Sequence, residues 1–302
     1  MLDAFLILDK PLGLSSQQAV SKVRRALGLR KAGHTGTLDP LATGVLPIGF
    51  GEATKVIPFL DESEKIYWVE AKLGESTATD DAEGEILQSR PVPPLGHPDL
   101  ETALQRFLGE QEQRPPRYSA IKVKGQALYR AARAGQACEA PLRTVKIFAV
   151  KILEWNSPQL RFRVHCGRGT YVRSLVRDLG EALGCGAHVT ALRRERSGPF
   201  LLERALTLEQ VLASPQAVPP AFFSIEDCLG HLPRIDLVSR EEQERTHQGQ
   251  VLARVAGEFP SDSPPDAHRV LTFLGQAVAV VKSGGNGYQF LRVLHRAWNE
   301  NK

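Results

Sequence analysis

The stretch "AGHTGTLDPLATG" (residues 32–44) holds three glycines, one histidine and one aspartate, and it contains no second carboxylate. A phosphate-binding loop would carry GxxxxGK[ST] before a helix or GxGxxG after a strand, and this stretch carries neither. Glycine permits positive φ, and an aspartate before a proline bonds its own backbone, so the same letters also suit an ordinary turn. Local chemistry alone therefore favours a structural loop over an active site built on Asp39.

Elements of regular structure are predicted on both sides of this loop. Before it, residues 3–10 have the apolar run of a short strand, and a helix capped by Ser15 or Ser16 follows. Helices are also predicted over residues 98–110 and, after a Thr170 cap, over residues 171–184. Strands are predicted over residues 45–50, 65–74, 143–155, 159–166 and 188–198. The loop is thus predicted to join a helix to a strand.

Composition excludes several classes of protein. The chain has 302 residues, of which 42% are hydrophobic and 24% charged, as in a globular protein and not a disordered one. No run approaches the roughly 20 apolar residues of a membrane span, and the amino terminus lacks the features of a secretory signal. The four cysteines form no CxxC pair, so neither a zinc site nor a disulfide framework is indicated. We expect a cytoplasmic protein with no metal and no membrane contact.

The net charge of +4 hides an uneven distribution. Residues 113–151 carry nine Lys and Arg against one acidic residue, whereas residues 61–112 carry thirteen acidic against four basic residues. A basic arm that includes Tyr118 and Tyr129 suits a polyanion, because each neutralised phosphate releases counterions. A solvated surface helix rich in arginine explains the charge equally well.

A change of pattern marks a second unit. Three prolines crowd residues 213–223, and after Pro233 a polar helix (residues 239–249) and short strands such as "VLARV" (residues 251–255) are predicted. The last 70 or so residues are too few for a large core. We therefore expect two domains, over residues 1–232 and 233–302, the second small and β-rich.

Several strings in a fixed order carry a resemblance to one family. They are "DKPLGLSS" (9–16), "RKAGHTGTLDPLATGVLPIGFGEATK" (30–55), "RPPRYSAIKVKGQALYRAARAG" (114–135) and "CGRGTYVRSLVRDLGEALGCGAHVTALRR" (166–194), followed by the β-rich carboxy-terminal unit. The chain resembles the bacterial tRNA pseudouridine-55 synthases of the TruB family, which end in a PUA domain. The resemblance implies an α+β fold, with a central mixed or antiparallel sheet flanked by helices, an RNA-clamping insertion and a PUA domain over residues 233–302. It also implies that the enzyme isomerises one T-loop uridine of tRNA to pseudouridine without a cofactor.

The resemblance assigns roles to individual residues. Asp39 corresponds to the catalytic aspartate, Arg173 pairs with it, and Tyr67 stacks on the flipped uracil. Such a pairing favours the charged carboxylate and fixes its direction, as a nucleophile requires. Three further positions match substrate-contacting residues, and two support the catalytic loop without reacting. The substrate-contacting residues are His34, Tyr171 and Leu192, and the supporting ones are Lys10 and Pro11.

The basic arm gains a role from the same resemblance. The insertion at about residues 114–140 is expected to fold over the T loop, and the PUA unit to contact the acceptor-stem side, in an enzyme that works as a monomer. The RNA-binding residues expected in the arm are Arg117, Lys122, Lys124 and Arg130. Arg168 occupies a variable position in "GRGTYVR". Two alternatives stay open, namely a tRNA-binding or tRNA-folding protein without catalysis, and a synthase of this family with another RNA target.

Overall fold

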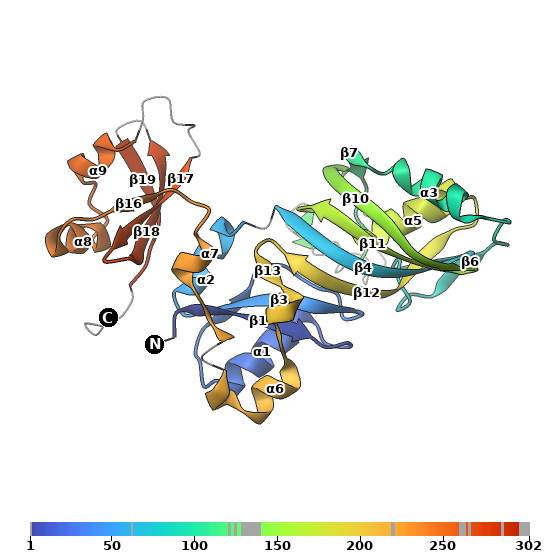
Figure 1. The fold of residues 1–302 in the computed structure, drawn as a ribbon, viewed down its shortest axis with the longest axis horizontal. Coiled ribbons are helices and arrows are strands. Elements are labelled where there is room, and N and C mark those ends of the chain that lie inside the picture. Colours follow the sequence, from blue (N-terminus) through green and yellow to red (C-terminus); the bar gives the residue numbers. More distant parts are fainter. Residues whose placement is uncertain are drawn as a thin grey trace.

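One large mixed sheet forms the centre of the computed structural model (Figure 1). The structure describes residues 2–61, 63–119, 122–123, 126–127, 140–218, 221–259, 264, 267–284 and 287–295. Within these residues the sheet has eleven strands. Its main path runs through β14 (Leu206–Thr207), β1 (Ala4–Lys10), β3 (Ala42–Phe50), β12 (Ala187–Ser197), β4 (Glu64–Leu73), β11 (Gln159–Gly167), β10 (Arg143–Asn156) and β7 (Gly109–Gln113). Three short strands pair beside this path: β2 (Ala32–His34), β13 (Phe200–Leu201) and β15 (Phe223–Ser224).

The middle of the sheet brings residues 32–44 beside a distant strand. The loop predicted here is shorter than expected, because residues 32–34 form β2 and residues 42–44 begin β3. β3 runs parallel to β12, with Leu192 opposite Ala42 and Arg194 opposite Gly44. Gly44 has φ +97°, and a Cβ at this position would collide with the backbone carbonyl of Arg194. Only glycine allows the two strands to approach this closely. The parallel contact therefore places Leu192 next to the loop that carries Asp39.

Helices flank this sheet as expected. They are α1 (Ser16–Ala26), α2 (Ala53–Val56), η1 (Ile57–Phe59), α3 (His97–Gln105), α5 (Val172–Ala182), α6 (Leu208–Ala213) and α7 (Ile225–Cys228), with short 3-10 turns η2 (Leu202–Arg204) and η3 (Pro215–Ala217). Ser15 caps α1 through a bond from the Gln18 amide. Tyr171, and not Thr170, is the N-cap residue of α5. The Thr170 hydroxyl instead donates to the Gly167 carbonyl at 3.0 Å and closes the preceding turn.

Two other sequence-based predictions are wrong in detail. The helix expected over residues 98–110 ends at Gln105, because residues 109–113 pair as β7 with the edge of β10. The strand expected at "VLARV" is helix α9 (Ala253–Gly257). Leu252 and Val255 are both buried, and residues three apart share a face of a helix but not of a strand. A five-residue apolar run cannot distinguish the two by itself.

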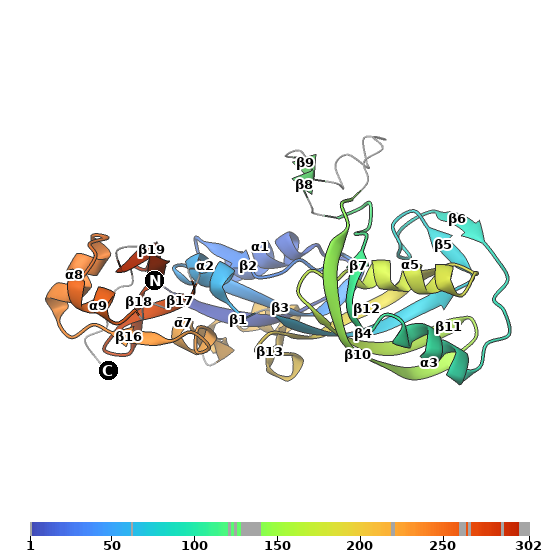
Figure 2. The ribbon, with the colours of Figure 1, turned by 90° about the horizontal axis from the view of Figure 1, so that it is seen from above.

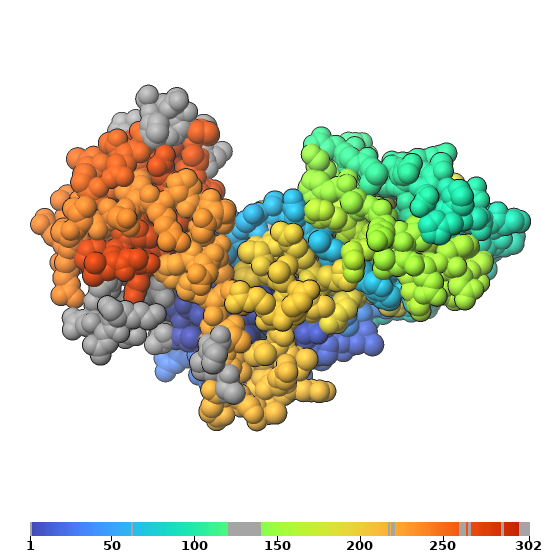
Figure 3. All heavy atoms as spheres, in the orientation of Figure 1, coloured from blue at the N-terminus to red at the C-terminus, as the bar shows by residue number. Residues whose placement is uncertain are grey.

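The carboxy-terminal unit is built on a separate sheet. Its four strands lie in the order β16 (Arg234–Asp236), β17 (His268–Phe273), β18 (Gln276–Gly284) and β19 (Gly287–Val293), with α8 (Arg240–His247) and α9 beside them (Figure 1). We call residues 233–295 the C-terminal module. The expected small β-rich unit is present, and the space-filling view shows a notch between it and the part that contains β7 and β10 (Figure 3).

The C-terminal module shares a hydrophobic core with the rest of the chain. Leu294 of the module and Phe5 of β1 belong to one buried cluster. Polar contacts hold the same junction, since Lys55 donates to the Val293 carbonyl at 3.0 Å and the His295 amide donates to Glu52 at 2.7 Å. The buried members from the two sides are Phe5, Ile7, Val45, Ala53, Val56, Leu60, Phe200, Phe223, Ile225, Cys228 and Leu229, and Val270, Ala277, Val280 and Leu294. The module is packed onto the central sheet and does not hang from a linker.

Two hairpins extend from the sheet on the side of α5. One pairs β5 (Glu75–Thr77) with β6 (Ile86–Ser89) and contains the turn at residues 78–85. The other pairs β8 (Lys122–Val123) with β9 (Gln126–Ala127) and stands away from the body of the molecule (Figure 2). Most of the insertion expected at residues 114–140, including its predicted helix, lies outside the described residues.

Candidate active site

A cleft of about 770 Å³ lies where β3, β4, β12 and α5 converge. Its lining comes from segments far apart in the sequence: α1, the loop after β2, β4, the turn at residues 78–85 and the loop before α5. Six residues singled out in the sequence meet there, namely His34, Asp39, Tyr67, Tyr171, Arg173 and Leu192. Their juxtaposition was expected from the resemblance, and the roles assigned to them stay predictions.

Hydrogen bonds to the backbone of alternate residues hold the loop that carries Asp39. Arg194 donates to the Gly36 carbonyl at 3.1 Å, and the Ser16 hydroxyl bonds both the carbonyl and the amide of Leu38, at 2.9 and 2.7 Å. The Pro40 carbonyl accepts from the Gly13 amide at 2.9 Å. Anchors on both sides of Asp39 fix its backbone, so its side chain enters the cleft with little freedom to turn.

Lys10 supports the same loop from beneath. Its side chain is fully buried, and its ammonium donates to the carbonyls of Pro11, Leu14 and Pro40 at 2.9, 2.6 and 3.4 Å. Burial lowers the pKa of Lys10 to about 8, although the Asp39 carboxylate opposes the shift. Lys10 and Pro11 do not line the cleft. The supporting role that the resemblance implies for both residues stays a prediction.

Arg173 joins two carboxylates at the bottom of the cleft. Its Nε donates to Asp39 Oδ2 at 2.9 Å, and its Nη1 lies 3.3 Å from Asp81 Oδ2. Carbonyls of Thr79 and Tyr118 accept from the two terminal nitrogens at 2.8 and 3.0 Å. The Arg173 side chain is only 6% exposed, so its charge is compensated by these groups and hardly by water. The pairing of Arg173 with Asp39 that the sequence led us to expect is present.

Opposing effects act on the Asp39 carboxyl. Burial raises its pKa above the ordinary value, Arg173 counteracts the rise, and the Asp81 carboxylate adds to it. The Asp39 side chain is still 35% exposed, whereas that of Asp81 is 3% exposed. Of the two carboxylates that Arg173 joins, Asp39 is therefore the one that a substrate can reach. Asp81 lies behind Arg173 and restrains the guanidinium from the other side.

Tyr67 and Arg194 form one wall of the cleft. Tyr67 lies on β4, directly opposite Arg194 in the β12 register. Burial raises the pKa of the Tyr67 phenol to about 12, and the neighbouring Arg194 guanidinium opposes that rise. The phenol therefore stays neutral at physiological pH, and its ring offers an apolar surface on which a flat base could stack.

Other predicted contact residues occupy the rim of the cleft. The Gln113 side chain clamps Tyr171, accepting from its amide at 2.8 Å and donating to its carbonyl at 3.1 Å. Leu192 is 8% exposed and lies on the parallel β3–β12 contact. His34 ends β2, opposite Ile48 of β3, at the start of the Asp39 loop.

The residues predicted to bind RNA in the basic arm are mostly beyond the described part. Arg117 is exposed and does not line the cleft, although its neighbour Tyr118 does. Only the backbone of Lys122 is described, within β8. Lys124 and Arg130 lie outside the described residues.

Sequence reasoning missed two functional candidates, Asp81 and Arg194. Asp81 sits among five acidic residues at positions 75–85, and only its contact with Arg173 distinguishes it. Arg194 is 1% exposed and donates to the carbonyls of Gly36 and Val45, at 3.1 and 2.7 Å. The one available signal was its position in the predicted strand 188–198. Alternation along that strand places Arg194 on the same face as the apolar Leu192.

The described residues hold neither a candidate metal site nor a candidate membrane-spanning helix. No group of three or more His, Cys, Asp or Glu side chains there is placed to hold a metal ion. No helix in that same part of the chain is long and apolar enough to cross a membrane.

Known proteins are similar to this chain in sequence. Residues 24–172 match the model of the TruB family pseudouridylate synthase N-terminal domain, and residues 173–218 match that of the tRNA pseudouridylate synthase B C-terminal domain. The tRNA pseudouridine synthase B of Xanthomonas axonopodis pv. citri is 48% identical over 263 residues, which are 86% of this chain and 84% of that protein. The protein of the same name from Pseudomonas paraeruginosa is 47% identical over 85% of this chain and 86% of its own length.

Solved structures share the fold. A Cbf5–Nop10–Gar1 complex contains a chain with a TM-score of 0.68 at 27% identity, covering 94% of this chain and 79% of the other. An H/ACA RNP bound to a substrate RNA containing 2′-deoxyuridine contains one with a TM-score of 0.72 at 25% identity, covering 97% and 85%. The fold, the cleft around Asp39 and these matches lead to one conclusion. The chain belongs to the TruB family of pseudouridylate synthases.

Proposed function

We propose that this pseudouridine synthase isomerises the T-loop uridine at position 55 of tRNA, with Asp39 as its nucleophile. The observation that carries the proposal is the Asp39 carboxylate, which is partly exposed in the cleft and held at 2.9 Å by a buried arginine whose other side faces Asp81. Relatives that are 47–48% identical over most of this chain bear the name tRNA pseudouridine synthase B, which supports tRNA as the substrate.

The reaction needs one nucleophile and no change of oxidation state. The N1–C1′ bond of uridine breaks, a C5–C1′ bond forms, C5 loses its proton and N1 gains one. A carboxylate can act by covalent or proton-transfer chemistry in such a sequence. Attack on C1′, attack on the base and initial removal of the C2′ proton all require an ionised Asp39. Arg173 favours that form because its charge opposes the effect of burial on the pKa of Asp39.

The target uridine must leave its stack to reach this cleft. An enzyme that reacts with a base inside a folded loop extrudes the nucleotide and holds it between side chains. Tyr67 offers a neutral, buried ring for the uracil face, while Leu192 and Tyr171 bound the pocket. His34 at the cleft mouth would occupy space vacated in the T loop.

The basic arm and the C-terminal module are proposed to hold the rest of the tRNA. In the arm, Arg117, Lys122, Lys124 and Arg130 would contact backbone phosphates of the T arm. The C-terminal module, a PUA domain in this proposal, would contact the acceptor-stem side and add affinity without chemistry. We expect the enzyme to work in the cytoplasm as a monomer.

Release of tritium from tRNA labelled at uridine C5 tests this function. Wild type should release the label from an unmodified transcript without an added cofactor or metal. Asp39→Asn should bind the same RNA with similar affinity and release none. Glu209→Gln, which removes an exposed carboxylate from α6, is the matched control and should retain full activity.

Two results would contradict the proposal. An active Asp39→Asn variant would refute the assignment of the nucleophile. A wild-type enzyme that binds tRNA but releases no label would favour a binding or folding role, and release from another RNA alone would favour a synthase with a different target.

A further inference from the structure

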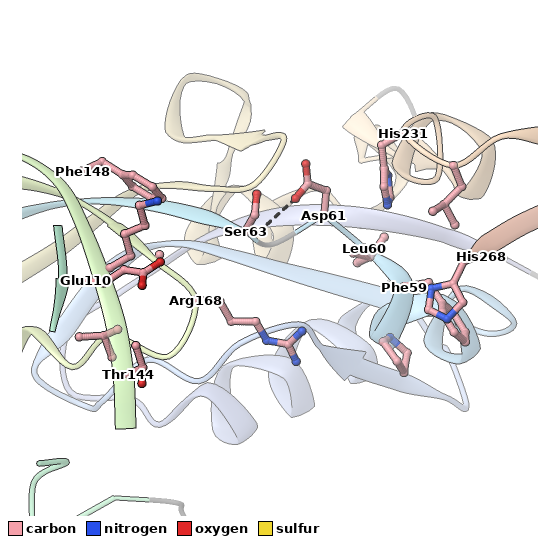
Figure 4. A pocket seen from close by; sticks show the side chains of 15 residues that line it. Phe59, Leu60, Asp61, Ser63, Glu110, Thr144, Phe148, Arg168, His231 and His268 are labelled. Atoms are coloured by element: carbon pink, nitrogen blue, oxygen red, sulfur yellow. Dashed lines mark hydrogen bonds between the residues drawn. The ribbon is translucent and has the colours of Figure 1, made fainter. Parts of the chain in front are cut away.

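A second hollow lies between the central sheet and the C-terminal module. It has a volume of about 600 Å³ and three walls: the turn at residues 58–63, the β7–β10 edge with the end of β11, and the module (Figure 4). His268 comes from the module, and His231 and Leu232 come from the segment just before it. The notch between the module and the β7–β10 region is visible in Figure 3. We call this hollow the junction groove.

The junction groove adjoins the active-site cleft. In the turn "GRGT", Gly167 and Arg168 line the groove, whereas Gly169 and Thr170 line the cleft. β4 makes the same transition, because Ser63 just before it faces the groove and Lys65 faces the cleft. One turn of chain thus separates the two hollows, and a polymer that leaves the cleft over this turn enters the groove.

Basic side chains project into the groove from fixed positions. The Arg168 amide donates to the Ser63 carbonyl at 3.1 Å, which ties this turn to the segment before β4. Its side chain is exposed, and its guanidinium has no hydrogen-bond or ion-pair partner within the part of the chain that the structure describes. Figure 4 shows it standing between the two walls. Lys146 lines the groove from β10, with its ammonium 5.7 Å from the Phe148 ring centre.

Each of the two carboxylates of the groove has a polar or basic neighbour. Asp61 accepts from the Ser63 amide at 3.1 Å, and this contact with Ser63 holds the pKa of the carboxyl below its ordinary value. Glu110 lies directly opposite Lys146 in the β7–β10 register, where opposite charges stabilise a strand pair. Lys146 has Glu110 opposite it, whereas the Arg168 guanidinium has no hydrogen-bond or ion-pair partner among the described residues, so Arg168 is the better placed of the two cations for an external anion.

We propose that the junction groove holds the phosphate backbone of the RNA stem that flanks the target loop, with Arg168 as its principal phosphate contact. This inference rests on the proposed action on tRNA. A guanidinium binds phosphate through charge-assisted hydrogen bonds and is less hydrated than an ammonium. The groove is far too small for a whole duplex, so one strand's backbone would lie in it. Such contacts fix position and carry no sequence information.

The test separates phosphate binding from catalysis. Dissociation constants are measured in the Asp39→Asn background with a T-arm hairpin, and with the same hairpin carrying uncharged methylphosphonate linkages in its stem. Arg168→Ala should weaken binding of the native hairpin roughly 3- to 10-fold and flatten the slope of log Kd against log salt by about 0.7–0.9, the value of one phosphate contact. It should not weaken binding of the methylphosphonate hairpin further. With Asp39 intact, kcat at saturating RNA should be unchanged.

Two variants complete the design. Arg168→Lys should keep most of the affinity and the salt slope, because a phosphate contact needs mainly the charge. Arg106→Ala removes another exposed arginine, at the end of α3, and should change the binding of neither hairpin. Three results for Arg168→Ala would overturn the groove assignment: an equal loss of affinity for both hairpins, a fall in kcat, or no loss of affinity at all. A wild type that binds these hairpins but releases no tritium would refute the proposed function and leave the groove test intact.

Discussion

Replacing Arg173 with alanine should lower both the folding stability and kcat, and the two losses can be measured separately. The change removes the 2.9 Å pair with Asp39 and the 3.3 Å pair with Asp81, and leaves both carboxylates without their shared cation. Two unit charges about 4 Å apart attract by ~4 kcal/mol at an effective dielectric constant of about 20. Removing one partner of a buried pair costs a similar ~3–5 kcal/mol of folding free energy. The melting temperature should fall by roughly 6–20 °C.

Catalysis should fall further than stability explains. Loss of a preorganised charge beside the reacting group typically costs about 10²–10³ in kcat. Arg173 also counteracts the rise that burial imposes on the pKa of Asp39, so without it that pKa rises further. Because the ionised form reacts, the acid limb of the kcat profile should move to higher pH. Single-turnover tritium release between pH 5 and pH 9 at about 20 °C measures both effects on folded protein.

Arg177→Ala is the matched control. Arg177 lies one turn further along α5 and pairs with Asp80 at 2.9 Å, on the same hairpin as Asp81. Its loss should reduce stability in the same manner but leave kcat and the pH profile close to wild type. If the Arg173 variant instead loses affinity for RNA as much as kcat, with an unmoved acid limb, Arg173 is a phosphate contact and the electrostatic argument is wrong.

Three further outcomes follow from the same geometry. Asp81→Asn should lower kcat ~10- to 100-fold but move the acid limb to lower pH, because Asp81 raises the pKa of Asp39; a shift to higher pH would contradict this. Asp39→Asn should melt above wild type at pH 8 and lose that advantage toward pH 4, since a carboxyl whose pKa is raised by folding destabilises the fold only once it ionises; equal melting curves at pH 8 would refute it. Gly44→Ala should yield little soluble protein, because its Cβ would meet the Arg194 carbonyl; normal yield and melting would disprove the strain.

Much of the fold could be predicted where a single strand or helix carries its own pattern. The alternation in residues 159–166 gave β11, and the apolar stripe after Tyr171 gave α5, because each element buries one face against the same core. Predictions were wrong where tertiary contacts decide the secondary structure of a segment. Residues 109–113 have the polarity of a helix end, yet β10 offers them an edge with which to pair.

The same distinction between local pattern and tertiary contact holds for the candidate site. A long, specific motif around Asp39 could be matched, and with it the partners that belong to the motif's family. Asp81 could not be predicted, because it looks like its acidic neighbours until the hairpin of β5 and β6 brings it to Arg173. The burial of Arg194 could not be predicted from the sequence for a related reason. An arginine in a strand is usually exposed, and only the carbonyls of Gly36 and Val45 make its burial favourable.

The core that the C-terminal module shares with β1 limits how such a chain can be shortened or recombined. Deleting residues 233–302 would remove Val270, Ala277, Val280 and Leu294 from this buried cluster and expose apolar surface of its remaining members, so a truncated enzyme should aggregate and not survive as a minimal catalyst. Exchange of the module between relatives would likewise require matched residues on β1 and β3. New RNA preferences are therefore reached more readily through surface loops, where insertions disturb no packing, than through gain or loss of the whole unit.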